Sequence, residues 1–249
     1  MGTHPNGLST LWEDPQTSLA GLVKTSPESF LGKSLTSGTF NEPGKFPQST
    51  QVPYLFKVLS IAKALPLQAH PDKNLAEKLN EEDRKQFVDN NHKPEIAIAL
   101  KDGFRGFVGF KELGKIVDSL KSVEELREAI GNEDLISSFI ENPTKESLRD
   151  VFSALLAAKE DVVKRCVGRL AERVESSSVD VIGDAKLADV IKILQHQYPN
   201  DVGVIAAPFF MNLVTLNRGE AIYIGADEAH AYLEGGEYIY YNTVQITFY

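Results

Sequence analysis

Apolar positions along this chain follow strand spacing, then helix spacing, then strand spacing again. Residues 54–70 and 95–108 are rich in β-branched and aromatic residues, with period-two stretches that predict strands. The polar segment between them, residues 74–89, has sparse apolar positions and predicts one surface helix. From Val202, "VGVIAAPFFMNLVTL" and "AIYIGADEAHAYLEGG" flank the turn "NRGE" and again predict strands.

The middle third has helical spacing. In "SVEEL", Ser122 is the expected helix cap, with Glu125 as its capping-box partner, and Gly131 is expected to end that helix. In "NPTKESLRDVFSALL", Asn142 is the expected cap and Pro143 the first-turn residue. Leu148, Val151, Phe152, Leu155 and Leu156 lie on one apolar stripe at helical spacing. The residues expected to be buried in this unit are Leu148, Val151, Phe152, Leu155, Val163, Cys166, Val167 and Leu170.

The order of these elements predicts an α+β fold in which a helical unit interrupts a sheet. Residues 111–198 form the predicted helical unit, and residues 1–110 and 199–249 supply the β part. Residues 1–53 are rich in Pro, Gly, Ser and Thr, which predicts loop with one short helix. The tail, Tyr238 to Tyr249, alternates aromatic and β-branched residues and is expected to pair as an edge strand.

Charge and cysteine content narrow the class of protein. The 249 residues carry a net charge of -9, which disfavours nucleic acid and anionic membrane surfaces as partners because both would be repelled. Cys166 is the only cysteine, so no intrachain disulfide is possible and a reducing compartment is expected. The first ten residues lack a signal-like apolar stretch, and no run approaches membrane-spanning length. The cytoplasm is therefore the expected location.

Polar pairs at strand spacing mark the candidate site. In "LQAHPDK", Gln68 and His70 stand two apart, so both project from one side of an extended chain. They can converge on a metal ion or merely form a turn. Glu95 shares its strand face with small alanines, which leaves room for a ligand, and Pro94 favours an extended Lys93 on the same side.

His230 and Tyr232 also stand two apart. With His230 included, the candidate metal ligands are Gln68, His70, Glu95 and His230. Two imidazoles, one carboxylate and one amide oxygen suit zinc in a catalytic site that keeps an open position. Simpler interpretations remain open at this point. Gln68 and His70 can cap the helix after Pro71, Glu95 can pair with Lys93, and His230 can be a satisfied loop histidine; a metal-free sugar-binding β domain would then be the result.

A family resemblance rests on the same segments. "MGTHPNG", "LFKVLSIAKALPLQAHPDKNLAEKL", "NHKPEIAIAL", "FRGFVGF" and "RGEAIYIGADEAHAYLEG" resemble, in order, the signature blocks of type I mannose-6-phosphate isomerases. The resemblance implies a zinc enzyme with a cupin-type jelly-roll domain, here incomplete, and an inserted all-helical domain. It implies that Gln68, His70, Glu95 and His230 bind Zn²⁺, and that the sugar-phosphate pocket is lined by Lys57, Lys93 and Tyr232.

The reaction that the resemblance implies interconverts mannose 6-phosphate and fructose 6-phosphate through a cis-enediol, in carbohydrate metabolism leading to GDP-mannose. A base must move a proton between C2 and C1 while a positive centre stabilises the enediolate. The catalytic candidates are Lys93, His230 and Tyr232, and a metal-bound water is a further candidate for the proton carrier. The resemblance also leads us to expect a monomer whose partner is a small sugar phosphate.

The sequence also departs from the family pattern. Pro66 stands where the family has a serine, a candidate phosphate contact, and proline removes a backbone N–H as well. The family's early Y-D-W-G block, its catalytic arginine block and its second jelly-roll domain have no counterpart in this sequence. The expectation is a chain truncated at both ends relative to the family. The alternative to an active isomerase is a catalytically impaired or inactive fragment or paralogue that retains metal binding.

Overall fold

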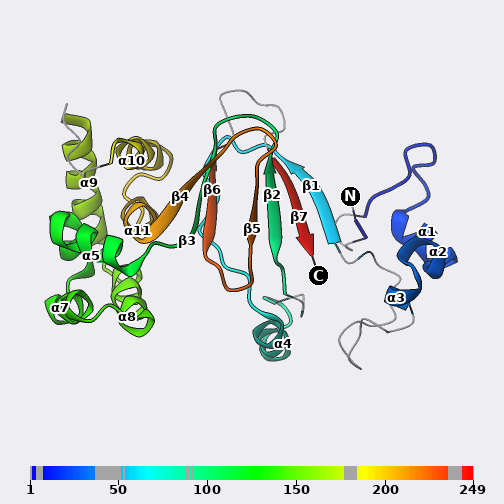
Figure 1. Cartoon of the computed structure of the whole chain (residues 1–249), viewed down its shortest axis with the longest axis horizontal. Coiled ribbons are helices and arrows are strands. Elements are labelled where there is room, and N and C mark those ends of the chain that lie inside the picture. The colour runs from blue at the N-terminus through cyan, green and yellow to red at the C-terminus, as the bar shows by residue number, and fades with distance from the viewer. Residues whose placement is uncertain are drawn as a thin grey trace.

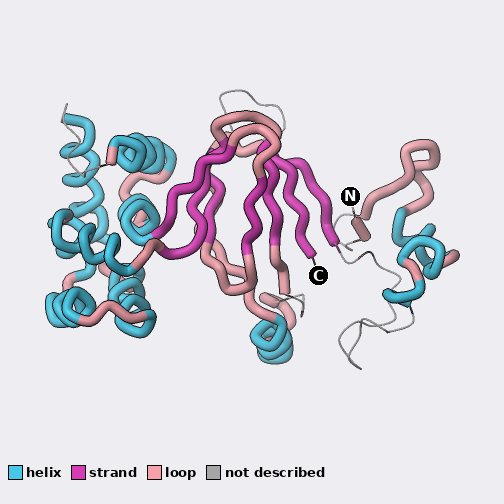
Figure 2. Tube along the Cα trace, viewed as in Figure 1, coloured by secondary structure: helices cyan, strands magenta, loops and turns pink. Residues whose placement is uncertain are grey.

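A bundle of helices lies beside two β-sheets, and a few short N-terminal helices lie on the opposite side of the sheets (Figure 1). The computed structural model describes residues 2–3, 8–36, 52, 54–87, 90, 92–176, 184–234 and 243–248. The helices of the middle third thus lie together on one side of the strands that precede and follow them in sequence, as Figure 2 shows. The predicted mixture of helix and sheet with a helical insertion is confirmed.

The N-terminal region contains more helix than expected. Three short helices follow one another in its described part: α1 (Leu19–Thr25), α2 (Pro27–Leu31) and α3 (Lys33–Thr36). The side chain of Ser18 caps α1 by accepting a hydrogen bond from the Gly21 N–H, and Pro27 occupies the first turn of α2. The expectation of loop with one helix was wrong because proline breaks a helix interior but fits the first turn.

Seven described strands form two antiparallel sheets. The four-stranded sheet has the order β1-β7-β2-β5, with β1 (Tyr54–Leu59), β7 (Thr243–Phe248), β2 (Glu95–Ala99) and β5 (Ala221–Ile224). The three-stranded sheet has the order β4-β3-β6, with β4 (Met211–Leu216), β3 (Phe104–Phe110) and β6 (His230–Glu234). The predicted strand over residues 54–70 therefore ends at Leu59, and the helix α4 (Lys73–Glu82) ends earlier than the expected residue 89.

The tail occupies an interior place in its sheet. β7 pairs with β1 on one side and with β2 on the other, whereas the sequence suggested an edge strand. The remainder of the predicted tail strand lies outside the described residues. An alternating pattern identifies a strand but does not reveal how many neighbours the strand has, because backbone pairing leaves no mark on side-chain periodicity.

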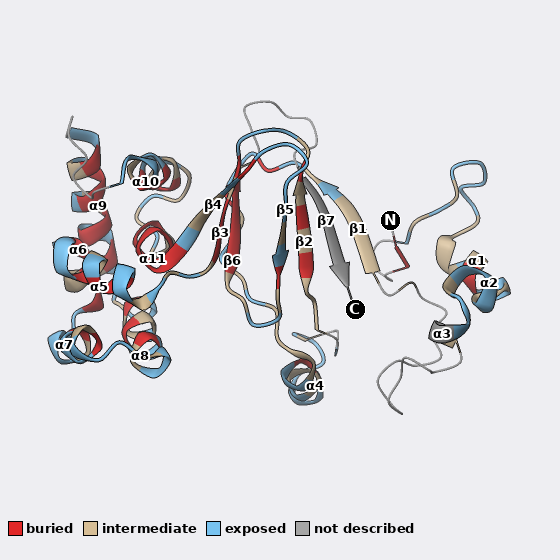
Figure 3. Ribbon diagram, viewed as in Figure 1, coloured by how far each residue is buried: buried red, intermediate tan, exposed pale blue. Residues whose placement is uncertain are grey.

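A small apolar core lies between the two sheets, on the side where the candidate site residues Glu95 and Tyr232 are buried. Alternate residues of β2, from Glu95 to Ala99, are buried. The ring of Phe104 on β3 meets the ring of Tyr232 on β6 edge-on, with centroids 5.6 Å apart. Phe107 and Leu233 point to the other face and join the core of the helical bundle, so the three-stranded sheet is covered on both sides (Figure 3).

The helical unit buries most of the predicted stripe. Its first six helices are α5 (Leu113–Ser122), α6 (Glu124–Ile130), α7 (Glu133–Glu141), α8 (Lys145–Leu156), α9 (Glu160–Ser176) and α10 (Ala185–Gln197). Every residue expected to be buried is buried except Phe152, which is partly exposed and packs edge-on against the rings of Phe110 and Phe210. Leu156, which was placed on the same stripe, is exposed. Cys166 is fully buried on α9, as a small core residue.

Two of the predicted caps were wrong. Ser122 ends α5, and α6 begins after Val123 without a side-chain cap. Glu125 is buried and pairs instead with Arg173 on α9, with Nη2 to Oε2 at 2.8 Å. The expected end of α6 is confirmed, because Gly131 adopts the left-handed conformation at φ 67°.

The second wrong cap lies between α7 and α8. Asn142 ends α7, and its N–H donates to the Ser138 carbonyl. Thr144 is the residue that caps α8, in a reciprocal capping box with Ser147. Pro143 therefore lies between the helices and not in the first turn. The pattern contained two capping candidates, Asn142 and Thr144, on either side of Pro143, and the pairing with Ser147 favours the later one.

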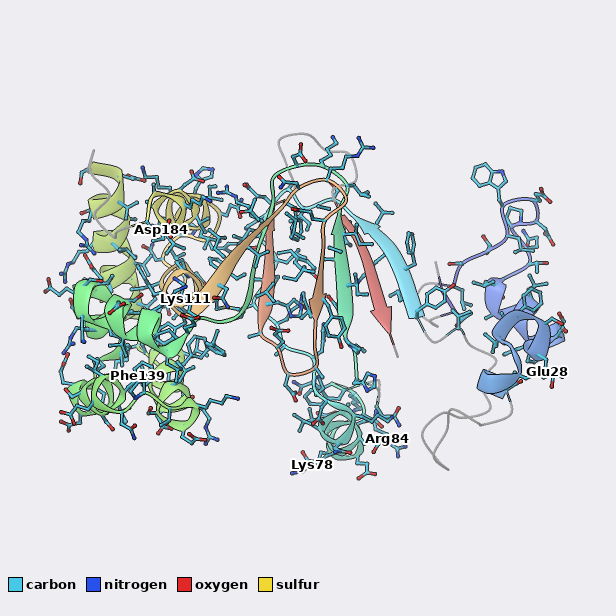
Figure 4. All side chains as sticks on the ribbon, in the orientation of Figure 1. Glu28, Lys78, Arg84, Lys111, Phe139 and Asp184 are labelled. Atoms are coloured by element: carbon cyan, nitrogen blue, oxygen red, sulfur yellow. The ribbon has the colours of Figure 1, made fainter. Side chains whose placement is uncertain are left out.

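The apolar run after Val202 forms a helix where a strand was predicted. α11 (Gly203–Phe210) is buried along all but its first residue, and β4 begins only at Met211. A run that is apolar on all sides has no periodicity to distinguish helix from strand. Lys111 holds the junction, because its Nζ donates to the Pro208 carbonyl and its N–H donates to the Phe210 carbonyl, near the end of α11 (Figure 4). Burial lowers the pKa of Lys111.

None of the described helices is both long enough and apolar enough to span a membrane.

The buried stripe leads to a stability prediction with a matched control one residue away. Leu155 is fully buried, whereas 49% of Leu156 is exposed. We expect Leu155→Ala to lower the free energy of unfolding by about 2 to 5 kcal/mol, and Leu156→Ala to change it by less than about 0.5 kcal/mol. Urea denaturation of both variants measures the difference. Equal losses in the two variants would contradict the described orientation of α8.

Candidate metal centre

Three potential metal ligands from distant parts of the chain gather between the sheets. His70 Nε2 lies 3.3 Å from Glu95 Oε1, and His230 Nε2 lies 3.7 Å from Glu95 Oε2. One ligand atom from each residue lies within 4.8 Å of the others. His230 is fully buried and Glu95 is 4% exposed, while His70 is only partly buried. The candidate metal centre is therefore closed to solvent at His230 and Glu95 and more open at His70.

Backbone pairing explains why the segment carrying His70 reaches this place. Gln68 and His230 exchange two backbone hydrogen bonds, with N to O distances of 3.0 and 2.8 Å. Residues paired in this way project their side chains to the same side, so Gln68 and His230 share a face. The Leu65 N–H adds a bond of 2.8 Å to the Tyr232 carbonyl, which holds the segment against β6. The prediction that the Gln68 side chain meets the other candidate ligands at one metal ion therefore depends on this backbone pairing.

The buried histidine has one nitrogen bonded and one unpartnered. His230 Nδ1 lies 2.9 Å from the Glu228 carbonyl oxygen, which can only accept, so we assign the proton to Nδ1. Nε2 then carries a lone pair. It is buried and has no hydrogen-bond partner in the described part of the chain. Buried polar atoms are nearly always satisfied, so a lone pair directed at a carboxylate fits a divalent cation between them.

Tyr232 contacts the carboxylate of the centre. Its hydroxyl donates to Glu95 Oε2 at 3.0 Å, and its side chain is 1% exposed. Burial, with a smaller contribution from the charge of Glu95, raises the pKa of Tyr232 above its ordinary value. The phenol therefore remains a donor at neutral pH and orients Glu95.

The two candidate lysines lie on or near the strands of the site. Lys57 on β1 pairs with Gln245 of β7, which in turn pairs with Ala97 of β2. Residues in one such row share a face, so Lys57 projects from the same face as Glu95. Lys93 lies just before β2 and is partly exposed.

Two of the simpler interpretations were wrong. Asp72 caps α4 by accepting a hydrogen bond from the Leu75 N–H at 2.7 Å, so neither Gln68 nor His70 is the cap. His230 begins β6 and is fully buried, so it is not a satisfied loop histidine. Sequence reasoning missed Asp227 and Glu228, whose turn contacts both histidines. The available signal was an acidic pair between Gly225 and the β6 strand.

Fold and site together define a class of protein: a buried centre of two histidines and one carboxylate, suited to a divalent cation, beside antiparallel sheets that carry a helical insertion. Residues 1–113 match the family model of the type I phosphomannose isomerase catalytic domain, and residues 121–211 match that of its helical insertion domain. The chain belongs to the type I phosphomannose isomerase family.

Pairwise comparisons with individual proteins lead to the same family. The chain is 39% identical over 249 residues to the mannose-6-phosphate isomerase of Candida albicans, covering 94% of this chain and 54% of that protein. It is 39% identical over 240 residues to mannose-6-phosphate isomerase 1 of Arabidopsis thaliana, covering 94% and 53%. The chain thus spans about half the length of the curated relatives it matches.

Solved structures share the fold. The apo form of mannose 6-phosphate isomerase from Salmonella typhimurium matches with a TM-score of 0.76 and 27% identity, covering 99% of this chain and 57% of that one. A zinc-bound holo mannose 6-phosphate isomerase matches with a TM-score of 0.77 and 26% identity, covering 100% and 58%. Both matches extend over essentially the whole of this chain.

Proposed function

We propose that this chain carries the metal centre of a zinc-dependent aldose-ketose isomerase that interconverts mannose 6-phosphate and fructose 6-phosphate. The observation that carries the proposal is the unpartnered, buried Nε2 of His230, directed at Glu95 beside His70. The donor set suits zinc, which is bound in a solved relative. We further propose that the sheets belong to a cupin-type jelly roll formed by residues 1–110 and 199–249, with residues 111–198 as the inserted domain.

Four residues would hold the metal: Gln68, His70, Glu95 and His230. When bound, zinc would polarise a carbonyl or hydroxyl oxygen of the sugar and so offset the charge that builds there. The partly exposed side of His70 would give the sugar access to this centre. The buried side, formed by Glu95 and His230, would exclude water from the metal.

Proton transfer through a cis-enediol needs a base that can reach C1 and C2 of the sugar. His230 has Nδ1 bonded to Glu228, and its Nε2 is assigned to the metal, so no ring nitrogen remains for the substrate. The Tyr232 hydroxyl is committed to Glu95. Among the three candidates we assign the proton transfer between C1 and C2 to Lys93, because Pro94 favours an extended backbone that places Lys93 on the same side as the ligand Glu95, two residues later.

Lys57 is the proposed phosphate contact. It lies in the cross-strand row of Ala97, two strands away, or roughly 10 Å at the usual strand spacing. The substrate and the long lysine side chain together span such a separation. A protein of net charge -9 needs a local cation of this kind to hold a dianionic phosphate.

We also propose that the protein acts as a cytoplasmic monomer.

The function is tested by adding zinc and mannose 6-phosphate to the purified chain and measuring fructose 6-phosphate. We expect product formation that requires Glu95, because Glu95→Gln replaces the charged ligand by a neutral amide.

The second candidate function is metal binding without turnover. Pro66 favours it, because an exposed proline offers the phosphate neither a hydroxyl nor an N–H. Tight zinc binding with no product would support this second function and contradict the first.

Lys57→Ala tests the proposed phosphate contact. Loss of one charge-assisted contact of about 1.5 to 3 kcal/mol predicts a KM for mannose 6-phosphate raised by roughly 10- to 100-fold, with a smaller effect on kcat. Lys101→Ala, an exposed lysine in the turn after β2, is the matched control and should leave KM unchanged. Steady-state kinetics of both variants decide the assignment, and an unchanged KM in Lys57→Ala would exclude it.

Tyr232→Phe tests whether the phenol acts on Glu95 or on the sugar. Removing the donor to Glu95 Oε2 should weaken zinc affinity by about 10-fold, since loss of a hydrogen-bond partner of a ligand commonly costs 10- to 100-fold. Competition with a chromophoric chelator measures the affinity. A variant with unchanged zinc affinity but impaired turnover would instead indicate direct contact with the substrate.

A further inference from the structure

A hydrogen bond to one of its own side chains closes the turn between β5 and β6, residues 225–229. The Gly225 N–H donates to Glu228 Oε2 at 3.0 Å. Asp227, at its centre, adopts a left-handed conformation with φ 60°. Aspartate tolerates this conformation better than most residues do, because its short polar side chain bonds locally. The turn is therefore built in one defined shape.

This turn determines which nitrogen of His230 faces the centre. The Glu228 carbonyl, positioned by the closed turn, accepts the hydrogen bond from His230 Nδ1 at 2.9 Å. With the proton on Nδ1, the lone pair lies on Nε2, on the side of Glu95. The opposite tautomer would present an N–H to the centre, and an N–H cannot bind a cation.

The same turn also forms hydrogen bonds with the backbone of the segment that carries His70. The Asp227 N–H donates to the His70 carbonyl at 2.7 Å, and Asp227 Oδ1 accepts from the Asp72 N–H at 3.1 Å. Asp72 is the residue that caps α4. The backbone on both sides of Pro71 is thereby attached to the turn that precedes the other histidine.

A third segment supports the turn from β3. The Gly109 N–H donates to the Ala229 carbonyl at 2.8 Å. Gly109 has φ +62°, and a Cβ placed there would lie 2.9 Å from Glu228 Oε1. Glycine at this position therefore leaves the space that the Glu228 carboxylate occupies.

We propose that the turn 225–229 is a positioning element for both histidines of the metal centre. Glu228 fixes the tautomer of His230, and Asp227 fixes the place of His70 relative to it. The inference rests on the proposed metal centre, but the tautomer is a property of the metal-free protein and is measurable without any metal. Neither residue contacts the metal in this proposal.

Glu228→Ala and Glu228→Gln test the first part. We expect the ring ¹⁵N shifts of His230 in the metal-free protein, with neutral imidazoles, to change from a single Nδ1–H tautomer to a mixture in Glu228→Ala. Zinc affinity, measured by chelator competition, should fall by about 10-fold. Glu228→Gln retains an acceptor for the Gly225 N–H and should preserve both the tautomer and most of the affinity. A single Nδ1–H tautomer in Glu228→Ala would overturn the inference.

Asp227→Ala tests the second part, with Asp227→Asn as the conservative variant. Alanine loses the acceptor for the Asp72 N–H and disfavours the left-handed conformation, so zinc affinity should fall by about 10-fold, and asparagine should restore it. Asp201→Ala is the matched control, because Asp201 accepts from the Gly203 N–H in an exposed turn between α10 and α11. Equal zinc affinity in Asp227→Ala and Asp201→Ala would overturn this part. Absence of zinc binding by the parent chain would contradict the proposed function and leave the tautomer result to decide the inference.

Discussion

Zinc affinity in His230→Ala is expected to fall by more than the roughly 10- to 100-fold that loss of a ligand's hydrogen-bond partner costs. The residue is fully buried, and its free Nε2 is directed at Glu95, so no neighbouring water can easily replace it. The remaining set would be Gln68, His70 and Glu95. Because His70 is partly exposed, the damaged centre would hold zinc only weakly. Competition with a chromophoric chelator measures the loss.

A stability measurement separates the loss of a ligand from the loss of a core residue. At a zinc concentration of 100 times Kd, binding stabilises the folded parent by about 2.7 kcal/mol, and this increment should vanish in His230→Ala. The variant's stability without zinc gives the cost of the deleted ring itself. His196→Ala, on the exposed side of α10, is the control and should keep the full increment. The metal centre would be refuted if His230→Ala kept it too.

Part of the candidate site was predictable, because Glu95, His230 and Tyr232 follow strand periodicity. Glu95 precedes two alanines at period two, and the structure buries all three on one face. His230 and Tyr232 likewise lie on one face of β6. The sequence could not show that the Tyr232 hydroxyl bonds to Glu95, because the two residues are far apart in the chain and their distance depends on strand order.

The errors in the fold have a common physical origin. Helix or strand was assigned from local periodicity, and periodicity disappears where a segment is buried on all sides, as in α11. The misplaced caps at Ser122 and Asn142 arose where two helices meet end to end, so that the polar residue that ends one helix resembles the cap of the next. In each case the local pattern allowed more than one assignment.

The place of β7 in the sheet also depended on long-range pairing. Ile246 lies opposite Phe56 of β1 on one side and Ile96 of β2 on the other. In an edge strand, every second N–H points away from the sheet and tolerates proline. In a strand with two neighbours, every N–H points at one neighbour or the other. The position of a proline therefore distinguishes an edge strand from an interior one.

Ile246→Pro is accordingly expected to lower the free energy of unfolding by roughly 3 kcal/mol, since it removes a ladder hydrogen bond and leaves a carbonyl of β1 or β2 without its donor. Ile246→Val keeps the N–H and the β-branched shape, and it should cost no more than about 1.5 kcal/mol. Urea denaturation compares the two. Zinc affinity should fall in the proline variant as well, because β2 carries Glu95 and loses part of its support on the β7 side. If Ile246→Pro and also Gln245→Pro leave stability unchanged, β7 does not lie between β1 and β2, because neighbouring residues in an interior strand donate to opposite sides.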